Sequence, residues 1–210
     1  MNTKLYFLDI FSKAEKKYGH SIKRLAAEGW KLHWQTLIVT IMSAQSRDET
    51  TIPIAEKLFE RYPTLPALAS ALYDDVFAIL KPLNYNKTKS KHVIATAYHL
   101  LQHHRGNVPH TMDELLCIPG VGRKTANLVL SECHSKDAIC IDTHCHRILN
   151  VLGIVKTKNP HQTEGAMMKI APREYWSRIN RILVLWGKDC PGRDKKRLLE
   201  KLEEKKRKEH

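Results

Sequence analysis

Residues 111–133, TMDELLCIPGVGRKTANLVLSEC, contain two helical patterns separated by a short turn with two glycines. Thr111 and Glu114 have the spacing of a capping box, so we expect a helix to begin there and to end before Pro119. A second helix is expected from Arg123 to Cys133, because its apolar residues recur at helical spacing. The stretch therefore predicts a helical hairpin.

The turn of this hairpin, Gly120-Val121-Gly122, is a candidate phosphate site. Glycine permits positive φ and leaves no side chain between the backbone N–H groups and a ligand. The positive end of the second helix attracts an anion, and Arg123 and Lys124 add full charges beside it. Taken alone, the turn is equally consistent with a tight connection between two packed helices.

Apolar residues recur at i, i+3 and i+4 along most of the chain, which predicts an all-α fold. Most prolines fall at or near the proposed helix boundaries, where their missing N–H is tolerated. The charged tail from Lys195 to His210 carries Leu198, Leu199 and Leu202 on one helical face, which predicts a short docked helix. The other expected helices span residues 5–18, 34–43, 47–61, 65–70, 73–81, 88–104, 112–117, 143–152, 161–171 and 173–188.

The chain of 210 residues carries 35 Lys and Arg against 22 Asp and Glu, a formal net charge of +13. This excess favours a polyanionic partner, either nucleic acid or an anionic membrane surface. The longest apolar run, residues 182–186, is far shorter than the roughly 20 residues of a membrane span, and the N-terminus lacks a signal-peptide pattern. We therefore expect a soluble, cytoplasmic and nucleoid-associated protein without membrane contact, and a monomer.

Cysteines and histidines give no recognisable metal-ligand set. Five cysteines, an odd number without a CxxC pair, predict reduced and buried thiols rather than disulfides. His99 and His103 have i, i+4 spacing, and His144 and His146 lie two residues apart, but no carboxylate or thiol grouping completes a site. No protein metal site is predicted from these residues.

Residues 138–149, AICIDTHCHRIL, place an aspartate between an apolar segment and a helical pattern. This position predicts that Asp142 is a helix N-cap. A carboxylate there can serve only as the cap, or it can stabilise positive charge that develops as a glycosidic bond breaks. The residues alone leave both roles open.

Four segments, in this order along the chain, together resemble the endonuclease III family of helix-hairpin-helix DNA glycosylases over about residues 26–190. Residues 37–48, LIVTIMSAQSRD, are similar to the family pattern L-L-S-A-Q-x-x-D, and residues 83–91, LNYNKTKSK, to its G-F/L-Y-x-x-K-A-x. The hairpin LCIPGVGRKTANLVL matches the family's helix-hairpin-helix, and IDTHCHR resembles V-D-T-H-V-x-R. The resemblance implies two helical lobes with a DNA-binding cleft between them: a six-helix lobe at 26–136, and a second lobe from 1–25 plus 137–210.

The same resemblance implies a base excision repair enzyme that removes a damaged base and nicks the strand. Lys124 would attack the sugar, and Asp142 would stabilise the developing charge or relay the proton of the lysine. Lysine reacts only as the neutral amine, and partial burial, Arg123 and the helix N-terminus would all disfavour its ammonium form. Without the resemblance, the sequence favours a phosphate contact as the role of Lys124.

Other roles carried by the resemblance concern the damaged duplex. Gln45 would fill the gap left by a flipped nucleotide, and Tyr85 would enter as the opposite wedge. Asn84 stands where glycine is usual, and Asn is the residue that best tolerates a left-handed backbone. Further DNA-binding candidates are Asn86, Lys89, Gly120, Gly122, Arg123, Thr143 and Arg147, and the lesion-pocket candidates are Ser43, Asp48 and His144.

One departure from the family concerns its iron–sulfur cluster. Many members hold the cluster with four cysteines spaced C-x6-C-x2-C-x5-C, whereas this chain has Cys190 at the first position and no cysteine after it. The 4Fe-4S cluster is therefore predicted to be absent, with its packing role passed to the helix around Leu198. The family pattern also permits a monovalent cation at the hairpin carbonyls.

Double-stranded DNA with a damaged base or an abasic site is the implied partner, but the lesion itself stays open. Oxidised pyrimidines, uracil and thymine opposite guanine are all compatible with the family. Three alternatives remain: a glycosylase that uses Asp142 and water alone, an adenine-specific mismatch enzyme, and a non-catalytic DNA-binding module. The first two are disfavoured because such members usually replace the lysine found here at position 124.

Overall fold

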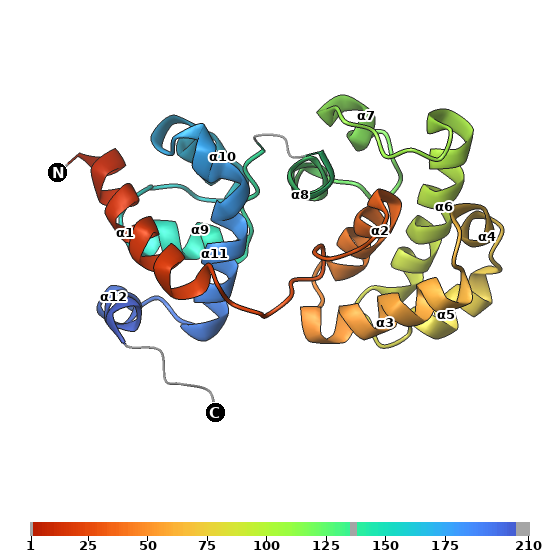
Figure 1. Cartoon of the computed structure of the whole chain (residues 1–210), viewed down its shortest axis with the longest axis horizontal. Helices are drawn as coiled ribbons and strands as arrows, with labels where there is room; N and C mark the ends of the chain where they lie inside the picture. Colours follow the sequence, from red (N-terminus) through yellow and green to blue (C-terminus); the bar gives the residue numbers. More distant parts are fainter. Residues whose placement is uncertain (1, 135–137, 205–210) are drawn as a thin grey trace. The chain divides into compact units, whose positions relative to one another are not determined.

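The expectation of an all-helical fold is confirmed. The computed structural model describes residues 2–134 and 138–204, which form twelve α-helices and one short 3-10 helix, with no strand among them (Figure 1). The chain divides into two compact units, one formed by Arg24–Lys136 and the other by Met1–Lys23 together with Asp137–His210. Within these described residues, no helix combines the length and apolarity needed to cross a membrane.

The unit Arg24–Lys136 is built around α2, most of whose residues are buried. Leu37, Ile38, Val39 and Met42 have no exposed surface, and α2 contacts α3, α6 and α8. Helix α6 also packs against α4 and α5, and α7 packs against α8. The helices of this unit are α2 His33–Ser43, α3 Asp48–Arg61, α4 Leu65–Ala69, α5 Tyr73–Leu80, α6 Asn86–His104, α7 Met112–Leu116 and α8 Arg123–His134.

The second unit is centred on α11, whose apolar face includes the fully buried Trp186. Helix α11 contacts α1 and α9, and α1 also contacts α10 and α12. Segments from both ends of the chain thus share one core. The elements of this unit are α1 Thr3–Tyr18, α9 Thr143–Val151, α10 Pro160–Ile170, the 3-10 helix Arg173–Tyr175, α11 Trp176–Asp189 and α12 Lys195–Glu203.

Side-chain caps explain where the functionally interesting helices begin. Thr111 is the N-cap of α7, as predicted: its hydroxyl accepts a hydrogen bond from the Glu114 N–H at 3.4 Å. The Glu114 carboxylate contacts the Thr111 hydroxyl instead of the Thr111 N–H, so the second bond of the predicted capping box is replaced. Asp142 is the N-cap of α9, as predicted, and its carboxylate accepts from the Cys145 N–H at 2.8 Å.

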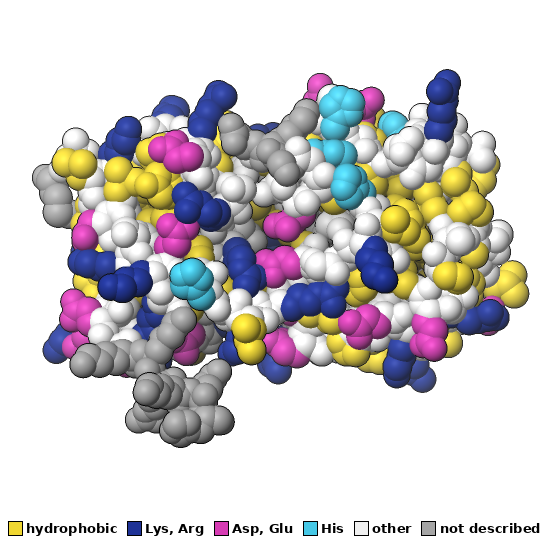
Figure 2. Space-filling view, in the orientation of Figure 1, with side chains coloured by type: hydrophobic (Ala, Val, Ile, Leu, Met, Phe, Trp, Pro, Cys, Tyr) yellow, Lys and Arg dark blue, Asp and Glu magenta, His cyan; other side chains and the backbone are white. Residues whose placement is uncertain are grey.

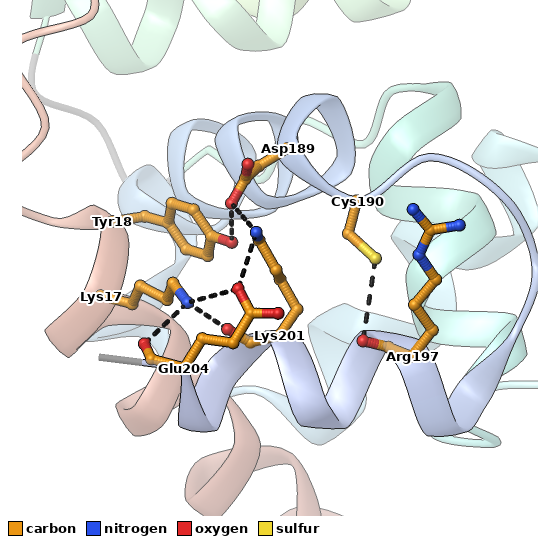
Figure 3. A network of polar contacts seen from close by, with 7 residues as sticks. All are labelled: Lys17, Tyr18, Asp189, Cys190, Arg197, Lys201 and Glu204. Carbon is orange, nitrogen blue, oxygen red and sulfur yellow. Dashed lines mark hydrogen bonds and ion pairs between the residues drawn. The ribbon is translucent and has the colours of Figure 1, made fainter. Parts of the chain in front are cut away.

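The predicted helix in the charged tail is confirmed as α12. Leu198 is 1% exposed, while Leu199 and Leu202 are half-buried; residues 205–210 of the tail lie outside the described residues. Polar contacts fix the end of this helix against α1 and α11 (Figure 3). The Tyr18 hydroxyl donates to Asp189 at 2.8 Å, and the Lys201 ammonium lies 3.6 Å from the same carboxylate.

The five cysteines form no disulfide, but they are not all buried as expected. Cys140, Cys145 and Cys190 are buried, and Cys133 is partly exposed. Cys117 is exposed, because it follows the short surface helix α7 instead of lying on a helix face that packs inward. The burial expectation was therefore wrong for Cys117.

Candidate functional site

The glycine turn between α7 and α8 has two glycines with different structural roles. Gly120 has φ +79°, and a Cβ there would lie 2.7 Å from the His92 ring nitrogen Nδ1. Gly122 does not have a positive φ, and a Cβ there would meet no heavy atom within 4 Å. The freedom for positive φ that the sequence offered at both glycines is therefore used at Gly120 and not at Gly122. The packing of the protein requires glycine only at Gly120, whereas Gly122 leaves the start of α8 uncovered.

The turn is held rigidly by its surroundings. The buried Thr96 of α6 donates its hydroxyl to the Pro119 carbonyl at 2.8 Å. The Val121 N–H donates to the Ile118 carbonyl at 3.1 Å, and the Val121 side chain is buried. Sequence reasoning did not find Thr96, because nothing local marks a hydroxyl that reaches a carbonyl 23 residues away.

Arg123 and Lys124 form the first turn of α8, and both side chains are exposed. The partial burial expected of Lys124 is therefore not observed among the residues of its own unit. The lysine instead lies at the positive end of the helix, two residues after the uncovered Gly122. This arrangement presents an amine and a guanidinium beside a set of backbone N–H groups, which together suit a phosphodiester.

The segment around Asp142 belongs to the other unit. The Asp142 carboxylate is largely buried at the start of α9, and the neighbouring Thr143 is exposed. His144 packs against α11, since a Cβ on Gly187 would lie 2.6 Å from the His144 ring nitrogen Nδ1. The glycine thus permits a close approach of α9 and α11, which fixes the helix that Asp142 caps.

Arg147 supports the chain that follows α11. Its guanidinium donates to the carbonyls of Gly187 at 3.0 Å and Cys190 at 3.3 Å, and also to Gly192. Burial lowers the pKa of Arg147. These contacts give Arg147 a role as a cap on the C-terminal end of α11, a role that the sequence did not indicate.

Two exposed side chains, those of Gln45 and Tyr85, stand on left-handed backbone in the unit Arg24–Lys136. Gln45 has φ 53° after the end of α2, and Tyr85 has φ 56° as the N-cap of α6. Non-glycine residues seldom adopt this conformation, and such strain gathers at functional sites. Tyr85 is also 64% exposed, so its ring is open to a partner.

Asn84 differs from expectation, since its backbone is not left-handed. The Asn84 side chain instead donates to the Gln45 carbonyl at 2.6 Å, and its N–H donates to the Ser46 hydroxyl at 3.2 Å. Lys89 is 4% exposed and donates to the same hydroxyl at 2.8 Å. Ser46 is a junction residue that sequence reasoning missed, because no motif marks a hydroxyl shared by two loops.

The remaining candidates make polar contacts within the unit Arg24–Lys136. The Asn86 amide donates to the Lys81 carbonyl at 2.7 Å, which closes the connection between α5 and α6. The Ser43 hydroxyl donates to Thr40 within α2 at 3.0 Å. Asp48, at the start of α3, accepts from the Ala26 N–H at 3.1 Å.

The residues near Cys190 do not fit the iron–sulfur cluster of the family. The buried Cys190 thiol donates to the Arg197 carbonyl at 3.8 Å, where α12 has begun (Figure 3). Within residues 2–134 and 138–204, no group of three or more His, Cys, Asp or Glu side chains is arranged to hold a metal ion.

Basic side chains do not form one block on the face shown in Figure 2, where Lys and Arg are interspersed with Asp and Glu. Charge alone therefore does not locate a DNA interface on this face, and the anchored turn before α8 remains the candidate anion site of its unit.

Comparison with known proteins shows the family of the chain. Residues 38–173 match the family model of the HhH-GPD superfamily base excision DNA repair proteins. This span contains the glycine turn, the left-handed residues Gln45 and Tyr85, and the N-cap Asp142. The chain belongs to this superfamily. It is an endonuclease III-type DNA glycosylase of base excision repair.

Sequence relatives of this superfamily member include endonuclease III of Thermotoga maritima, which is 41% identical over 155 residues, covering 74% of this chain and 73% of the relative. Endonuclease III of Escherichia coli K12 is 29% identical over 181 residues, 86% of this chain and 84% of the relative. A solved structure of a trapped endonuclease III–DNA covalent intermediate, the estranged-adenine complex, superposes with a TM-score of 0.83 at 27% identity, covering 90% of this chain and 88% of that one.

Proposed function

We propose that this glycosylase is bifunctional: it removes a damaged pyrimidine from double-stranded DNA and then cuts the strand at the abasic site as a lyase. The observation that carries the proposal is Lys124, an exposed amine in the first turn of α8, directly after a glycine turn held in place by Thr96. The covalent DNA intermediate trapped for a relative supports a nucleophile of this kind.

In the proposed reaction, the neutral amine of Lys124 attacks C1′ of the damaged nucleotide. A bond forms between the lysine nitrogen and C1′, and the C–N glycosidic bond breaks with its electron pair and a proton leaving on the base. Ring opening gives a Schiff base between Lys124 and the sugar. Loss of the C2′ proton then expels the 3′ phosphate by β-elimination, and water releases the lysine. The products are a free base and a nicked strand.

Asp142 is proposed to stabilise the positive charge that develops on the sugar as the base departs. Its cap bond to the Cys145 N–H supports this role, because the cap uses one carboxylate oxygen and fixes the orientation of the other. An exposed Thr143 beside it is a candidate contact for the DNA backbone. Asp142 thus has both roles that the sequence left open.

Binding of the duplex is proposed to begin at the glycine turn. A phosphate would accept hydrogen bonds from the backbone around Gly122, with Arg123 adding a charge-assisted contact. Gln45 and Tyr85 would then enter the duplex where the damaged nucleotide rotates out, since both stand exposed on strained backbone. The base opposite the lesion would meet Gln45.

Borohydride trapping tests the proposal. Wild type and Lys124→Gln are incubated with labelled duplexes that contain thymine glycol, uracil or an abasic site, and borohydride reduces any Schiff base to a stable adduct. Lys57→Gln is the matched control, because Lys57 is an exposed lysine of α3 and the change removes the same charge. We expect an adduct with wild type and Lys57→Gln but none with Lys124→Gln, and the duplex trapped fastest identifies the lesion class.

Two outcomes would contradict the proposal. Excision of a base by wild type without any adduct would indicate a glycosylase that uses Asp142 and water alone. Binding of every duplex without excision or nicking would indicate a DNA-binding module without catalysis.

A further inference from the structure

The two loops that carry Gln45 and Tyr85 are tied to each other, and we call their polar contact the loop junction. It consists of Gln45, Ser46, Asn84 and Lys89. The Asn84 amide donates to the Gln45 carbonyl at 2.6 Å, and the Ser46 hydroxyl accepts from both the Asn84 N–H at 3.2 Å and the Lys89 amine at 2.8 Å. Both lone pairs of the Ser46 hydroxyl are thereby used.

Lys89 is an unexpected residue to bury at this place. It is 4% exposed, and its hydrogen-bond partner in the part of the chain that the structure describes is the Ser46 hydroxyl, with no carboxylate paired to it there. Burial lowers the pKa of Lys89 to about 8, which expresses the cost of keeping an ammonium away from water. An apolar side chain would fill the same space at lower cost, so stability alone does not account for a lysine here.

The left-handed backbone in both loops costs conformational free energy in addition to the cost of burying Lys89. Gln45 and Tyr85 have φ values of 53° and 56°, and each would relax to a more common conformation unless its surroundings prevented it. The loop junction supplies this restraint, because it bonds the carbonyl of Gln45 itself, the residue after it, and the residue before Tyr85. Both strained residues keep their side chains exposed.

We propose that Lys89 and Asn84 are positioning residues, which lock the loops of Gln45 and Tyr85 into one rigid unit before DNA is bound. The inference rests on the proposed function, in which these two side chains enter the duplex. A pair of side chains that is already oriented loses less conformational freedom on insertion than two independent loops would. The junction thus acts on the flipping step, while the glycine turn before α8 acts on general DNA binding.

The position of Lys89 along α6 separates it from its neighbours. Lys87 and Lys91 are exposed, whereas Lys89 points inward, so the run of alternating lysines is not one solvated face. The side-chain amide of Asn84 reaches the Gln45 carbonyl. The glycine that is usual in the family at this position has no side chain to make this bond. The tether through Asn84 is therefore a property of this chain.

The test uses a duplex with a non-cleavable abasic-site analogue opposite 2-aminopurine, whose fluorescence rises when the base is unstacked. Wild type is compared with Lys89→Met, Asn84→Ala and Ser46→Ala, and Lys57→Met is the matched control for loss of an exposed lysine charge. We expect Lys57→Met to match wild type. The junction variants should bind undamaged duplex within about twofold of it, because the glycine turn is intact. Their fluorescence rise on this duplex should fall on the order of tenfold to a hundredfold, because the inserted side chains are misplaced. Their single-turnover excision, measured on a separate duplex that contains a damaged base, should fall by a similar factor.

Each result decides between the two proposals. Wild-type fluorescence that none of the junction variants reduces would overturn the inference and leave the proposed function standing. A wild type that gives no fluorescence change on the analogue duplex would overturn the insertion of Gln45 and Tyr85 and with it this inference, while the borohydride assay decides the glycosylase and lyase activity separately. If Lys89→Met fails to fold, Ser46→Ala removes the shared acceptor with a smaller change, and its double variant with Asn84→Ala should lose little more than either single one, since both act through one junction.

Discussion

Asp142 combines a structural bond and a proposed chemical role in one carboxylate. One of its oxygens accepts the Cys145 N–H at the start of α9, and the side chain is largely buried. A neutral amide can make the same cap bond, since Asn is as good an N-cap as Asp. The cap and the charge can therefore be separated by a single substitution.

We expect Asp142→Asn to leave the free energy of unfolding within about 0.5 kcal/mol of wild type, because the cap is retained. Base excision should fall on the order of a hundredfold or more, because the developing positive charge loses its counter-charge. Asp142→Ala is the control that loses both the cap bond and the negative charge. It should therefore also lower the free energy of unfolding by about 1 kcal/mol. Thermal melts and single-turnover assays measure the two effects, and an active Asp142→Asn would remove the electrostatic role.

Lys89 gives the protein a predictable dependence of stability on pH. Its pKa is lowered from 10.5 to about 8 by burial, so between these values the unfolded chain binds more protons at this site than the folded chain does. The free energy of unfolding should therefore rise with pH across this window, by up to about 3 kcal/mol from this group. Lys89→Met should remove this rise, as measured by denaturant unfolding at a series of pH values, and a rise that persists in the variant would belong to other groups.

At the scale of elements, the two glycines of the hairpin formed by α7 and α8 differ in their backbone conformation and in the space around them. Gly120 has both a positive φ and His92 against the position of a Cβ. Gly122 has neither constraint from the protein itself. A methyl group added at each position therefore distinguishes a requirement of folding from a requirement of binding.

Gly120→Ala should destabilise the protein by about 1–3 kcal/mol, through backbone strain and the clash with His92. Gly122→Ala should change stability by no more than about 0.5 kcal/mol. It should still weaken duplex binding, because the methyl group would stand between the backbone N–H groups and a phosphate. Chemical denaturation and DNA titrations check the pair. Unchanged affinity in Gly122→Ala would argue against the turn as the phosphate site.

Helix α12 contributes to the core of its unit through Leu198, which is 1% exposed. Leu198→Ala should cost about 2–5 kcal/mol, because it removes a fully buried side chain. The control is Leu5→Ala on α1, where the side chain is 64% exposed and the cost should be within about 0.5 kcal/mol. Thermal unfolding compares the two, and equal effects would mean that α12 is not a stabilising element.

On the scale of the whole molecule, the chain has the helices of its superfamily but not the cysteines that hold the cluster in many members. Arg147 binds the carbonyls of Gly187 and Cys190, and α12 then packs beside α1. The contacts of Lys17, Tyr18, Asp189, Lys201 and Glu204 hold the end of that helix (Figure 3). A hydrogen-bonded and apolar closure thus stands in the chain segment where the cluster ligands would follow Cys190.

We expect the purified protein to contain far less than one cluster equivalent of iron and to lack cluster absorbance in the visible range. Exposure to chelator or air should leave its melting temperature and excision rate unchanged, because the cluster that such treatment would destroy is predicted to be absent. Elemental analysis and melts before and after treatment make the comparison. Stoichiometric iron that is needed for folding would contradict this prediction.

The sequence by itself determined the helices, the caps at Thr111 and Asp142, and the family. These features depend on neighbours a few residues apart, where periodicity, capping chemistry and motif spacing act locally. Even the tail helix around Leu198 followed from spacing along one face. The roles of Lys124 and Asp142 also came from the sequence, through the family resemblance, and remain proposals for experiment.

Only the tertiary structure decided which residues support the site. The burial of Lys89, the shared hydroxyl of Ser46, the tether from Asn84 and the capping role of Arg147 all depend on groups that lie far apart in sequence. In the tertiary structure the left-handed backbone is found at Tyr85 and not at Asn84, and Gly122, just before α8, has no positive φ. The physical reason is that burial and hydrogen-bond partners are properties of packed neighbours, which no local pattern encodes.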